Sequence, residues 1–481
     1  MRRKIMIICG FILLGCCICG FIFRKDIINF VSSVSSHFSE YNDVLFVDFE
    51  KMTGEIKPLN GINNGPKNGY SGDSEEDSWQ LDATQMYKDL VIPIVRTHDS
   101  EYPYGQDKFI DIHCIFPDFS KNVEDPGSYN FSYTDKYIEA IIETGAEVFF
   151  RLGESIDHSG DNLYINPPAD YMKWAQICEH IIRHYNEGWA SGYEYDIKYW
   201  EIWNEPDNDL MWTGTMEEYT ELYKTTASYL KKIYPDIYIG GYAAAECDED
   251  IISGFLQSLS SDRENVPLDF FSWHTYTSDP VSYRENAALV REILDENGFE
   301  NTISILDEWN YVKNWEDLDG ITEMVRSVKG ASFIAASMIT MQNSKVDMAM
   351  YYDGQFAYDD FAWCGLYSAD TEKLPGYYVF DFFETLYRQK KQVYLSKSET
   401  LDNIYGLAVS GEKNCILLTN YKDEENITSV FRLSFTGDRN NAIITRINEK
   451  SHERKTTKQK AFFNELVISL KSGETVFIEL E

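Results

Sequence analysis

Strand-like and helix-like segments alternate over most of the chain, and this alternation constrains the fold more than any other feature of the sequence. Eight short runs have the apolar, β-branched and aromatic composition of buried strands. Helical patterns such as Pro168–Tyr185 and Met216–Ile233 lie between them. The predicted strands are Lys57–Ile62, Val91–Thr97, Glu147–Leu152, Ile197–Trp203, Ile237–Tyr242, Leu268–Trp273, Thr302–Asp307 and Val346–Tyr352.

Strand–helix units repeated in this way predict an α/β fold, a (β/α)8 TIM barrel whose parallel strands close into an inner cylinder. An open, doubly wound sheet would give a similar alternation, but no Gly-rich phosphate loop follows the first predicted strand. In a barrel, the residues that follow each strand gather at one end, where such enzymes keep their catalytic groups.

The sequence changes character after Tyr378. Short alternating runs joined by polar segments, without a helix of normal length, predict a C-terminal antiparallel β-sandwich. Val44–Phe49 alternates in the same way, which leaves open that it adds a strand to the sandwich. We therefore expect a catalytic barrel over residues 44–385 and a β-sandwich over residues 386–481. The predicted sandwich strands are Tyr405–Val409, Cys415–Asn420, Ser429–Phe435, Ala442–Ile447, Leu466–Leu470 and Val476–Leu480.

The N-terminal segment is strongly apolar. Ile5 to Phe23 form an uncharged run of 19 residues with basic residues on both sides, long enough to span a bilayer. We predict a transmembrane anchor over residues 1–25 and a tether over residues 26–43, which would make this a single-pass cell-membrane protein with an extracellular catalytic domain. A cleaved signal peptide, giving a secreted protein, and a lipoprotein cleaved at Cys16 are the alternatives.

Composition and spacing argue against several classes of function. A formal net charge of −36 would repel a phosphate backbone, so we expect no nucleic-acid partner. His180 and His184 have helical spacing but lack the HExxH pattern, and no CxxC spacing occurs, so neither a metal nor another cofactor is expected. No GxSxG element supports a serine triad.

Two acidic residues stand at the ends of predicted strands. Tyr199–Asp207 runs from an aromatic strand into Glu205 and is stopped by Pro206, which cannot donate to a sheet ladder. Thr302–Asp307 leads into Glu308 in the same way. Two carboxylates on separate strand ends are what cleavage of a glycosidic bond requires, one as acid/base and one as nucleophile or base.

Each of these residues has a competing interpretation. Glu205 could open the next helix as a surface residue, but the tryptophans of its strand favour a site that keeps an acid protonated. Asp307 rivals Glu308, because alternating side chains make the two acids face opposite ways and the pattern does not say which is inward. Glu201 shares the face of Glu205 by period two, and we interpret it as a structural ion-pair partner inside the barrel.

Other polar residues follow the second and sixth predicted strands. An arginine such as Arg96 keeps a neighbouring carboxylate ionised, as a nucleophile needs, although a salt bridge inside the barrel is the plainer interpretation. His274 and Tyr276 stand together at the end of the sixth strand, where they can orient a nucleophile or bind hydroxyl groups.

Taken together, these segments resemble the glycoside hydrolase clan whose barrels carry the catalytic glutamates on strands four and seven. Within that clan they are most similar to family 39, which includes β-xylosidases and α-L-iduronidases, and the resemblance extends roughly from Asn60 to Thr385. It is carried by Arg96-Thr97-His98, Trp200-Glu201-Ile202-Trp203-Asn204-Glu205-Pro206-Asp207, His274-Thr275-Tyr276 and Asp307-Glu308-Trp309-Asn310.

The resemblance implies a retaining glycosidase that acts on an oligo- or polysaccharide, with Glu205 as acid/base and Glu308 as nucleophile. A xyloside or arabinoside is favoured by resemblance only. A uronide would need a cationic pocket, for which Arg96 and Arg151 are the candidates. The alternative function is a catalytically inactive, carbohydrate-binding barrel on the cell surface. The resemblance further implies a substrate-binding and supporting set of His98, Asn204, His274, Tyr276 and Trp363, with Arg96 behind it.

Overall fold

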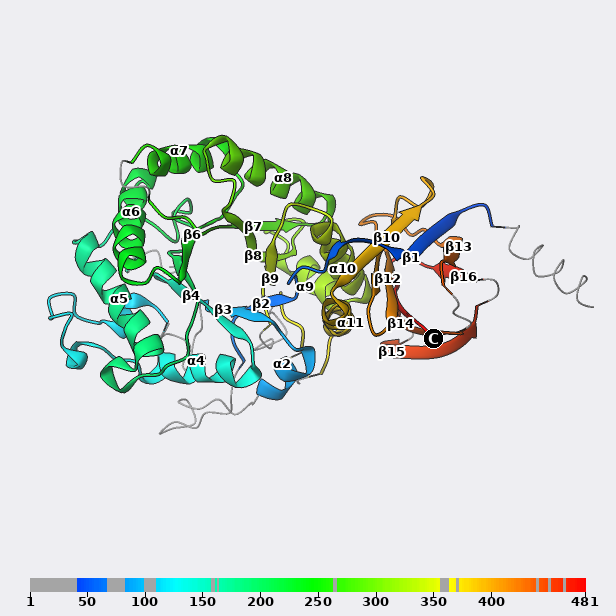
Figure 1. Ribbon diagram of the computed structural model, residues 1–481, viewed down its shortest axis with the longest axis horizontal. Helices are drawn as coiled ribbons and strands as arrows, with labels where there is room; N and C mark the ends of the chain where they lie inside the picture. Colours follow the sequence, from blue (N-terminus) through cyan, green and yellow to red (C-terminus); the bar gives the residue numbers. More distant parts are fainter. Residues whose placement is uncertain are drawn as a thin grey trace, which may run out of the picture.

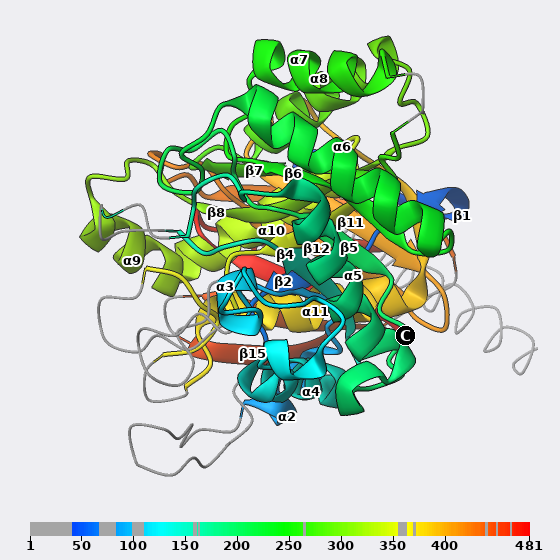
Figure 2. The same ribbon diagram turned by 90° about the vertical axis from the view of Figure 1, so that its left-hand side faces the viewer.

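The structure, a computed structural model, describes residues 41–66, 83–98, 110–156, 161, 164–262, 266–354, 363–368, 372–437, 441–448, 451–461 and 464–481. A helix-ringed barrel and a β-sheet domain lie side by side (Figure 1), and Figure 2 views the molecule from the barrel side. The predicted transmembrane segment, Ile5 to Phe23, lies outside the described residues. Within them, no helix combines the length and apolar character needed to cross a membrane.

The barrel consists of eight parallel strands that pair in chain order and close on themselves. The predicted barrel is therefore confirmed, and closure excludes the open, doubly wound sheet. Every predicted strand overlaps an observed one, although most differ at their ends. The observed strands are β2 (Gly61–Asn63), β3 (Ile94–Arg96), β4 (Glu147–Leu152), β5 (Tyr199–Ile202), β6 (Tyr238–Ala244), β7 (Phe270–Thr277), β8 (Ile303–Tyr311) and β9 (Met348–Tyr351).

Amphipathic helices cover the outside of the barrel (Figure 1). Their ends carry the expected signals: Thr215 and Glu218 form a capping box at the start of α6, and Gly188 adopts a left-handed conformation at the end of α5. The helices are α2 (Thr84–Leu90), α3 (Ile112–Ile115), α4 (Ser132–Thr144), α5 (Tyr171–Glu187), α6 (Met216–Ile233), α7 (Glu249–Ser260), α8 (Val281–Glu296), α9 (Leu318–Arg326), α10 (Val328–Gln342) and α11 (Pro375–Gln389), with short 3-10 turns at Pro126–Ser128 and Trp189–Ser191.

The inside of the barrel is apolar at one level and polar at the next. Ile94, Phe149, Phe270, Ile305 and Met350 pack together within the cylinder. Because side chains on a strand repeat their direction every second residue, the residues two positions further along point into the same interior nearer the C-terminal end. On β3, β4 and β8 these are Arg96, Arg151 and Asp307, all buried.

The C-terminal domain is one continuous nine-stranded sheet, whereas a sandwich of two separate sheets was predicted. β10 and β11 share only two residue pairs, and the domain core draws on strands from both sides of that weak junction. The sheet therefore folds over on itself around a single core. Its strands are β1 (Val44–Glu55), β10 (Lys391–Lys397), β11 (Ile404–Ser410), β12 (Asn414–Asn420), β13 (Ser429–Phe435), β14 (Asn441–Asn448), β15 (Ser451–Lys460), β16 (Glu465–Leu470) and β17 (Thr475–Leu480).

Two features connect this sheet with the rest of the chain. β1 pairs antiparallel with β10 and parallel with β13, so the first described strand lies in the C-terminal domain and the barrel begins at β2. Helix α10 is buried along almost its whole length because it packs between the barrel and strands β11 and β12. Such all-round burial suits a sequence that is largely apolar on all sides of the helix.

Candidate active site

Glu205 lies just beyond β5, in a tightly folded turn at the mouth of the barrel. Trp203 and Glu205 have φ angles of 73° and 46°, in the left-handed region that residues other than glycine rarely adopt. The backbone amide of Glu205 donates a hydrogen bond to the carbonyl of Ala243 in β6, 3.0 Å away. The turn follows the end of β5 at Ile202 and ties the position of Glu205 to the neighbouring strand.

The Glu205 carboxylate has two polar partners. Nδ1 of His274 lies 2.7 Å from Oε1, and the amide nitrogen of Asn208 donates to Oε2 at 2.8 Å. The side chain keeps 15% of its surface exposed. This carboxyl group is therefore oriented by neighbours and still open toward the space above the barrel.

Glu308 is held far more tightly. Its Oε1 lies 2.8 Å from Nη1 of Arg96 and 2.6 Å from Nε2 of His98, and the Tyr276 hydroxyl donates to Oε2 at 2.7 Å. Burial opposes ionisation of this carboxyl, but the charges of His274, His98 and Arg96 outweigh it and hold its pKa well below the usual range. Glu308 is therefore a carboxylate at neutral pH.

A bulge in β8 brings Glu308 to the same side as Asp307. Trp273 on β7 pairs with Leu306, and the next residue, His274, pairs with Glu308, so Asp307 is the extra residue. Both acids consequently reach Arg96, Asp307 through Oδ2 at 3.0 Å from Nε. The expectation that the two acids face opposite ways is wrong, because the bulge interrupts the strict alternation on which it rested.

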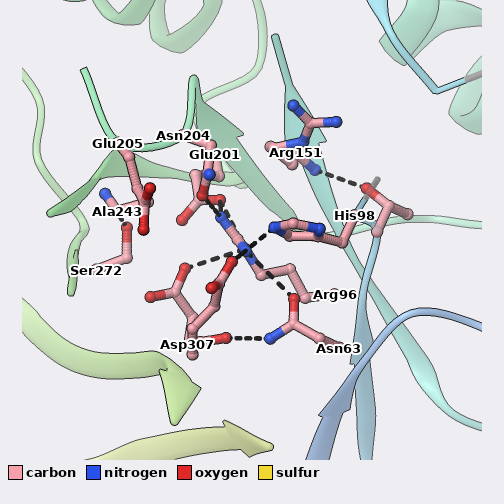
Figure 3. A network of polar contacts seen from close by, with 12 residues as sticks. Asn63, Arg96, His98, Arg151, Glu201, Asn204, Glu205, Ala243, Ser272 and Asp307 are labelled. Carbon is pink, nitrogen blue, oxygen red and sulfur yellow. Dashed lines mark hydrogen bonds and ion pairs between the residues drawn. The ribbon is translucent and has the colours of Figure 1, made fainter. Parts of the chain in front are cut away.

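Arg96 is fully buried at the centre of this network (Figure 3). Its Nη2 donates to Glu201 and to Oδ1 of Asn204, both at 2.6 Å. Its Nε pairs with Asp307, and its Nη1 pairs with Glu308. Burial alone would lower its pKa, but the surrounding carboxylates raise it. Arg96 is thus both a buried ion-pair partner and a contact of Glu308, and Glu201 is the interior ion-pair partner that its position indicated.

The surroundings raise the pKa of both Asp307 and His274. Burial and the charge of Glu201 raise the pKa of Asp307 well above its usual range despite Arg96. Burial would lower the pKa of His274, but Glu308, Asp307 and Glu205 raise it to about 9. His274 Nδ1 lies 2.7 Å from Glu205 and 3.6 Å from Glu308, so one imidazolium contacts both glutamates.

The glutamates converge on one another. One carboxylate oxygen of Glu205, one of Glu308 and a ring nitrogen of His274 all lie within 4.8 Å of each other. That spacing would also suit a cation, which would have to displace the proton that His274 otherwise retains up to about pH 9. The arrangement is therefore a pair of carboxylates bridged by an imidazolium.

A second cluster lies beside the site, after β4. The guanidinium of Arg151 pairs with Asp111 at 3.0 Å, and His113 pairs with Glu154. Burial opposes the charge of His113, but its neighbours raise its pKa to about 11, so this group also keeps its proton. The cluster anchors the α3 segment to the end of β4, and it commits Arg151 to a carboxylate of the protein itself.

A cavity of about 840 Å³ opens above the two glutamates. Of the predicted site residues, Glu205, Glu308, His98, Asn204, Tyr276 and Trp363 line it, whereas Arg96 and His274 lie behind them. The sequence analysis missed Trp315, Asp207, Asp209, Glu246 and Asp248, which also line the cavity. Their one available signal was their position in segments that follow barrel strands.

The cavity wall nearest Glu308 is aromatic. The ring of Tyr276 lies 5.1 Å from that of Trp315 and 5.9 Å from that of Trp363, and Trp363 stacks on Tyr352 at 5.6 Å. Trp315 keeps 52% of its surface exposed. A partly exposed aromatic wall beside a pair of carboxylates offers flat apolar surface against which a sugar ring can stack.

The chain matches known proteins over this region. Residues 73–353, more than half of the chain, match the family described as glycosyl hydrolases family 39. A β-xylosidase from Caldicellulosiruptor saccharolyticus is 26% identical over 344 residues, which are 63% of this chain and 67% of that protein. A β-xylosidase from Geobacillus stearothermophilus is 32% identical over 161 residues, 31% of either chain. The crystal structure of a glucosidase from Croceicoccus marinus shares the fold with a TM-score of 0.71 at 22% identity, covering 91% of this chain and 98% of that one.

Proposed function

Because the chain belongs to the glycosyl hydrolases of family 39, we propose that it cleaves a glycosidic bond of an oligo- or polysaccharide with retention of anomeric configuration. In this proposal Glu205 is the acid/base and Glu308 the nucleophile. The observation that carries the proposal is the approach of their carboxylate oxygens to within 4.8 Å. Retaining enzymes hold the two carboxyl groups about 5–5.5 Å apart, whereas inverting enzymes leave about 6.5–9.5 Å for a water molecule.

The electrostatics of the two groups fit these roles. Glu308 is ionised and can attack the anomeric carbon while Glu205 gives its proton to the departing oxygen. The Glu205 carboxylate formed in this step is stabilised by the imidazolium of His274 at 2.7 Å. In the second step Glu205 takes a proton from water, which attacks the glycosyl-enzyme and releases Glu308.

The proposed substrate contacts follow from the same geometry. Oδ1 of Asn204 accepts from Arg96, which can only donate, so its amide nitrogen is left to donate to a sugar hydroxyl near the reacting carbon. His98 lines the cavity next to Glu308. Trp363 and Tyr276 form the wall against which the sugar ring packs.

We propose a neutral pentoside, a xyloside or arabinoside, as the glycone. The two relatives described above are named β-xylosidases. None of the described residues that line the cavity is Lys or Arg, and the candidate cations Arg96 and Arg151 are committed to carboxylates of the protein. A uronide would therefore meet acids without a compensating cation.

Hydrolysis of a panel of 4-nitrophenyl glycosides, followed by proton NMR, tests this proposal. The panel contains β-xyloside, α-L-arabinofuranoside, β-glucoside and an α-L-iduronide. We expect turnover of a pentoside, and we expect the first product seen by NMR to have the anomeric configuration of the substrate. An inverted product would refute the mechanism, and a uronide hydrolysed in preference to the pentosides would refute the glycone.

A further inference from the structure

Asn208 stands in the turn that follows β5, three residues after Glu205, and its side chain lines the cavity. Its amide nitrogen donates to Oε2 of Glu205 at 2.8 Å, and its amide oxygen accepts from the backbone N–H of Leu210 at 3.0 Å. Because a backbone N–H can only donate, the oxygen of the amide must face Leu210 and the nitrogen must face Glu205. Asn208 therefore presents a hydrogen-bond donor to the carboxyl group of Glu205.

The backbone around Asn208 is fixed as well. Its N–H donates to the carbonyl of Glu205 at 3.0 Å, and its carbonyl accepts from the amides of Met211 and Trp212 at 2.8 and 3.0 Å. The indole of Trp203 donates to the carbonyl of Met211 at 2.9 Å, and both tryptophans are buried. The side chain of Asn208 cannot leave Glu205 without breaking this turn.

A turn of this kind does not by itself require asparagine. It needs a side-chain oxygen that accepts from the amide two residues later, and aspartate supplies that oxygen equally well. The chain uses aspartate in such turns at Asp118, Asp125 and Asp279. At position 208 an aspartate would set a second carboxylate oxygen against Oε2 of Glu205. The nitrogen of the amide is therefore the part of Asn208 that the turn alone does not explain.

The two carboxyl oxygens of Glu205 have different surroundings. Oε1 lies 2.7 Å from Nδ1 of His274, whose side chain is fully buried. Oε2 contacts Asn208, which lines the cavity. A protonated carboxyl oxygen can accept one hydrogen bond while it donates another. Oε2 can therefore accept from Asn208 and still hold the proton that passes to the substrate, whereas Oε1 is directed toward the protein.

We propose that Asn208 is a positioning residue that holds Oε2 of Glu205 toward the cavity as the atom that gives and takes the proton. In the first step the O–H bond of Oε2 breaks and its electrons stay on the carboxylate. The departing oxygen takes this proton and the electrons of the glycosidic bond, while Glu308 bonds to the anomeric carbon. In the second step Oε2 takes a proton from the attacking water, and the electrons of the bond to Glu308 return to that carboxylate.

The hydrogen bond from Asn208 stabilises the carboxylate that exists between the two steps. The inference rests on the proposed function, because it assigns one oxygen of Glu205 to the acid and base work of that reaction. It adds a residue that acts through Glu205 rather than on the substrate, so its removal should change the pH dependence of the reaction as well as its rate.

Among the described residues, the titratable groups that interact with Glu205 come from three segments. His274 and Tyr276 belong to β7, Glu308 belongs to β8, and Asp207 belongs to the turn after β5. All of them remain in a variant of Asn208. A change in pH dependence in such a variant therefore reports the loss of the amide donor.

The variant Asn208→Asp removes the donor and keeps the turn, because its carboxylate can still accept from Leu210. It also sets a negative charge beside Glu205, which favours the protonated acid. We expect the alkaline limb of the pH profile of kcat/KM to move to higher pH by about one to two pH units. Asn208→Ala, which adds no charge, should move the limb in the same direction by about half a unit to one unit.

The profiles are measured on whichever 4-nitrophenyl glycoside of the panel is turned over. The limb is assigned to Glu205 if it is absent in Glu205→Ala. The matched control is Asn122→Asp, which makes the same exchange in an exposed turn where the amide oxygen accepts from Glu124. It adds the same charge to the protein and should leave the limb unchanged.

A limb that stays in place in Asn208→Asp, or one that moves equally in Asn122→Asp, would overturn the inference. Loss of activity without a shift of the limb would show that Asn208 supports only the fold. If circular dichroism shows that Asn208→Asp is unfolded, the shift in Asn208→Ala decides between these outcomes.

A failure of the proposed function gives a different result. If no glycoside is turned over, or if the alkaline limb survives in Glu205→Ala, Glu205 is not the acid/base. The titration of its carboxyl group is then followed by NMR in protein labelled with ¹³C at the glutamate side-chain carboxyl, and Glu205→Gln identifies the resonance. A titration that moves to higher pH in Asn208→Asp and not in Asn122→Asp supports control of this proton by Asn208, and equal titrations refute it.

Discussion

The two glutamates at the mouth of the barrel are one residue type in two different settings. Glu205 stands in a turn, with 15% of its side chain exposed, and contacts one histidine and one asparagine. Glu308 stands on a bulged strand, with 5% exposed, and is held by Arg96, His98 and Tyr276. The two settings differ in the number of cations around the carboxylate, and the larger number holds the pKa of Glu308 well below its usual range.

Replacing each glutamate in turn is the strongest test of the difference between Glu205 and Glu308. Glu308→Ala should lower turnover of an activated aryl glycoside by about 10⁴-fold or more, because no nucleophile remains. Glu205→Ala should still form the glycosyl-enzyme from such a substrate, and added azide, which needs no base, should restore turnover. Stopped-flow release of nitrophenol and NMR of the glycosyl azide measure both effects.

The azide product also distinguishes the two positions. With Glu205→Ala the azide should have the anomeric configuration of the substrate, whereas any product from Glu308→Ala should have the opposite one. If the two variants exchange these behaviours while both remain folded by circular dichroism, the assignment of roles is reversed.

Removing Arg96 should be the next largest perturbation. Arg96→Met leaves buried acids without their cation, which we expect to cost about 3–5 kcal/mol of unfolding free energy. Urea denaturation measures this loss. Arg151→Met is the matched control, since Arg151 is equally buried but pairs with Asp111. Both variants should lose stability. Only Arg96→Met should also raise the apparent pKa of the acid limb of the pH–activity profile, because Glu308 loses a cation.

The imidazolium between the glutamates should make stability depend on pH. His274 has a folded-state pKa of about 9, above the value of about 6.5 expected when unfolded. Its contribution is fully present below about pH 6.5 and is lost as the pH rises through about 9, by at most about 3 kcal/mol. Urea midpoints measured from pH 6 to pH 9.5 should fall, and His274→Gln should flatten that slope. A slope unchanged in His274→Gln would place the titrating group elsewhere.

Tyr276 supplies only one of the contacts of Glu308, so its removal should have a smaller effect. Tyr276→Phe deletes a hydrogen bond to a charged group, worth about 1.5–3 kcal/mol, and should lower kcat/KM by about ten- to a hundredfold. The control is Tyr283→Phe, whose hydroxyl donates to the carbonyl of Asn310 on the outer side of β8. Equal losses in the two variants would show that Tyr276 acts through general stability.

The aromatic wall should give the smallest effect. Trp315→Ala removes a half-exposed ring that touches Tyr276, and we expect KM for an oligosaccharide to rise about two- to fivefold with kcat nearly unchanged. Steady-state kinetics on an oligosaccharide and on a simple aryl glycoside separate the two parameters. A fall in kcat instead would show that the ring orders the catalytic groups.

Much of this comparison could be predicted from the sequence. The eight barrel strands follow from apolar runs at regular spacing, because strands of a parallel sheet are buried on both faces. The position of Glu205 at a strand end could be predicted because Pro206 cannot continue a strand. β15 could not be found in this way, because Ser451–Lys460 is polar and charged throughout and has no apolar alternation to reveal a strand.

The setting of Glu308 could not be predicted because it depends on register. The extra residue at Asp307 is defined only by how β8 pairs with β7, a contact between strands that the local pattern does not contain. The acids that line the cavity after β5 and β6 were missed for a similar reason. Asp207 and Glu246 belong to segments after different strands, and only closure of the barrel brings these segments to one cavity.

The pairing of β1 with the C-terminal sheet has a consequence for how the protein is made. Val44 hydrogen-bonds Ser398, 354 residues later in the chain. At a synthesis rate of about 5–20 residues per second, the ribosome needs roughly 20–70 s to deliver that partner. During this time Leu45, Val47 and Phe49, which the finished protein buries, have no sheet to join. The nascent chain therefore carries an unpaired apolar strand for most of its synthesis. Such a strand can pair with other chains until its own sheet has been made.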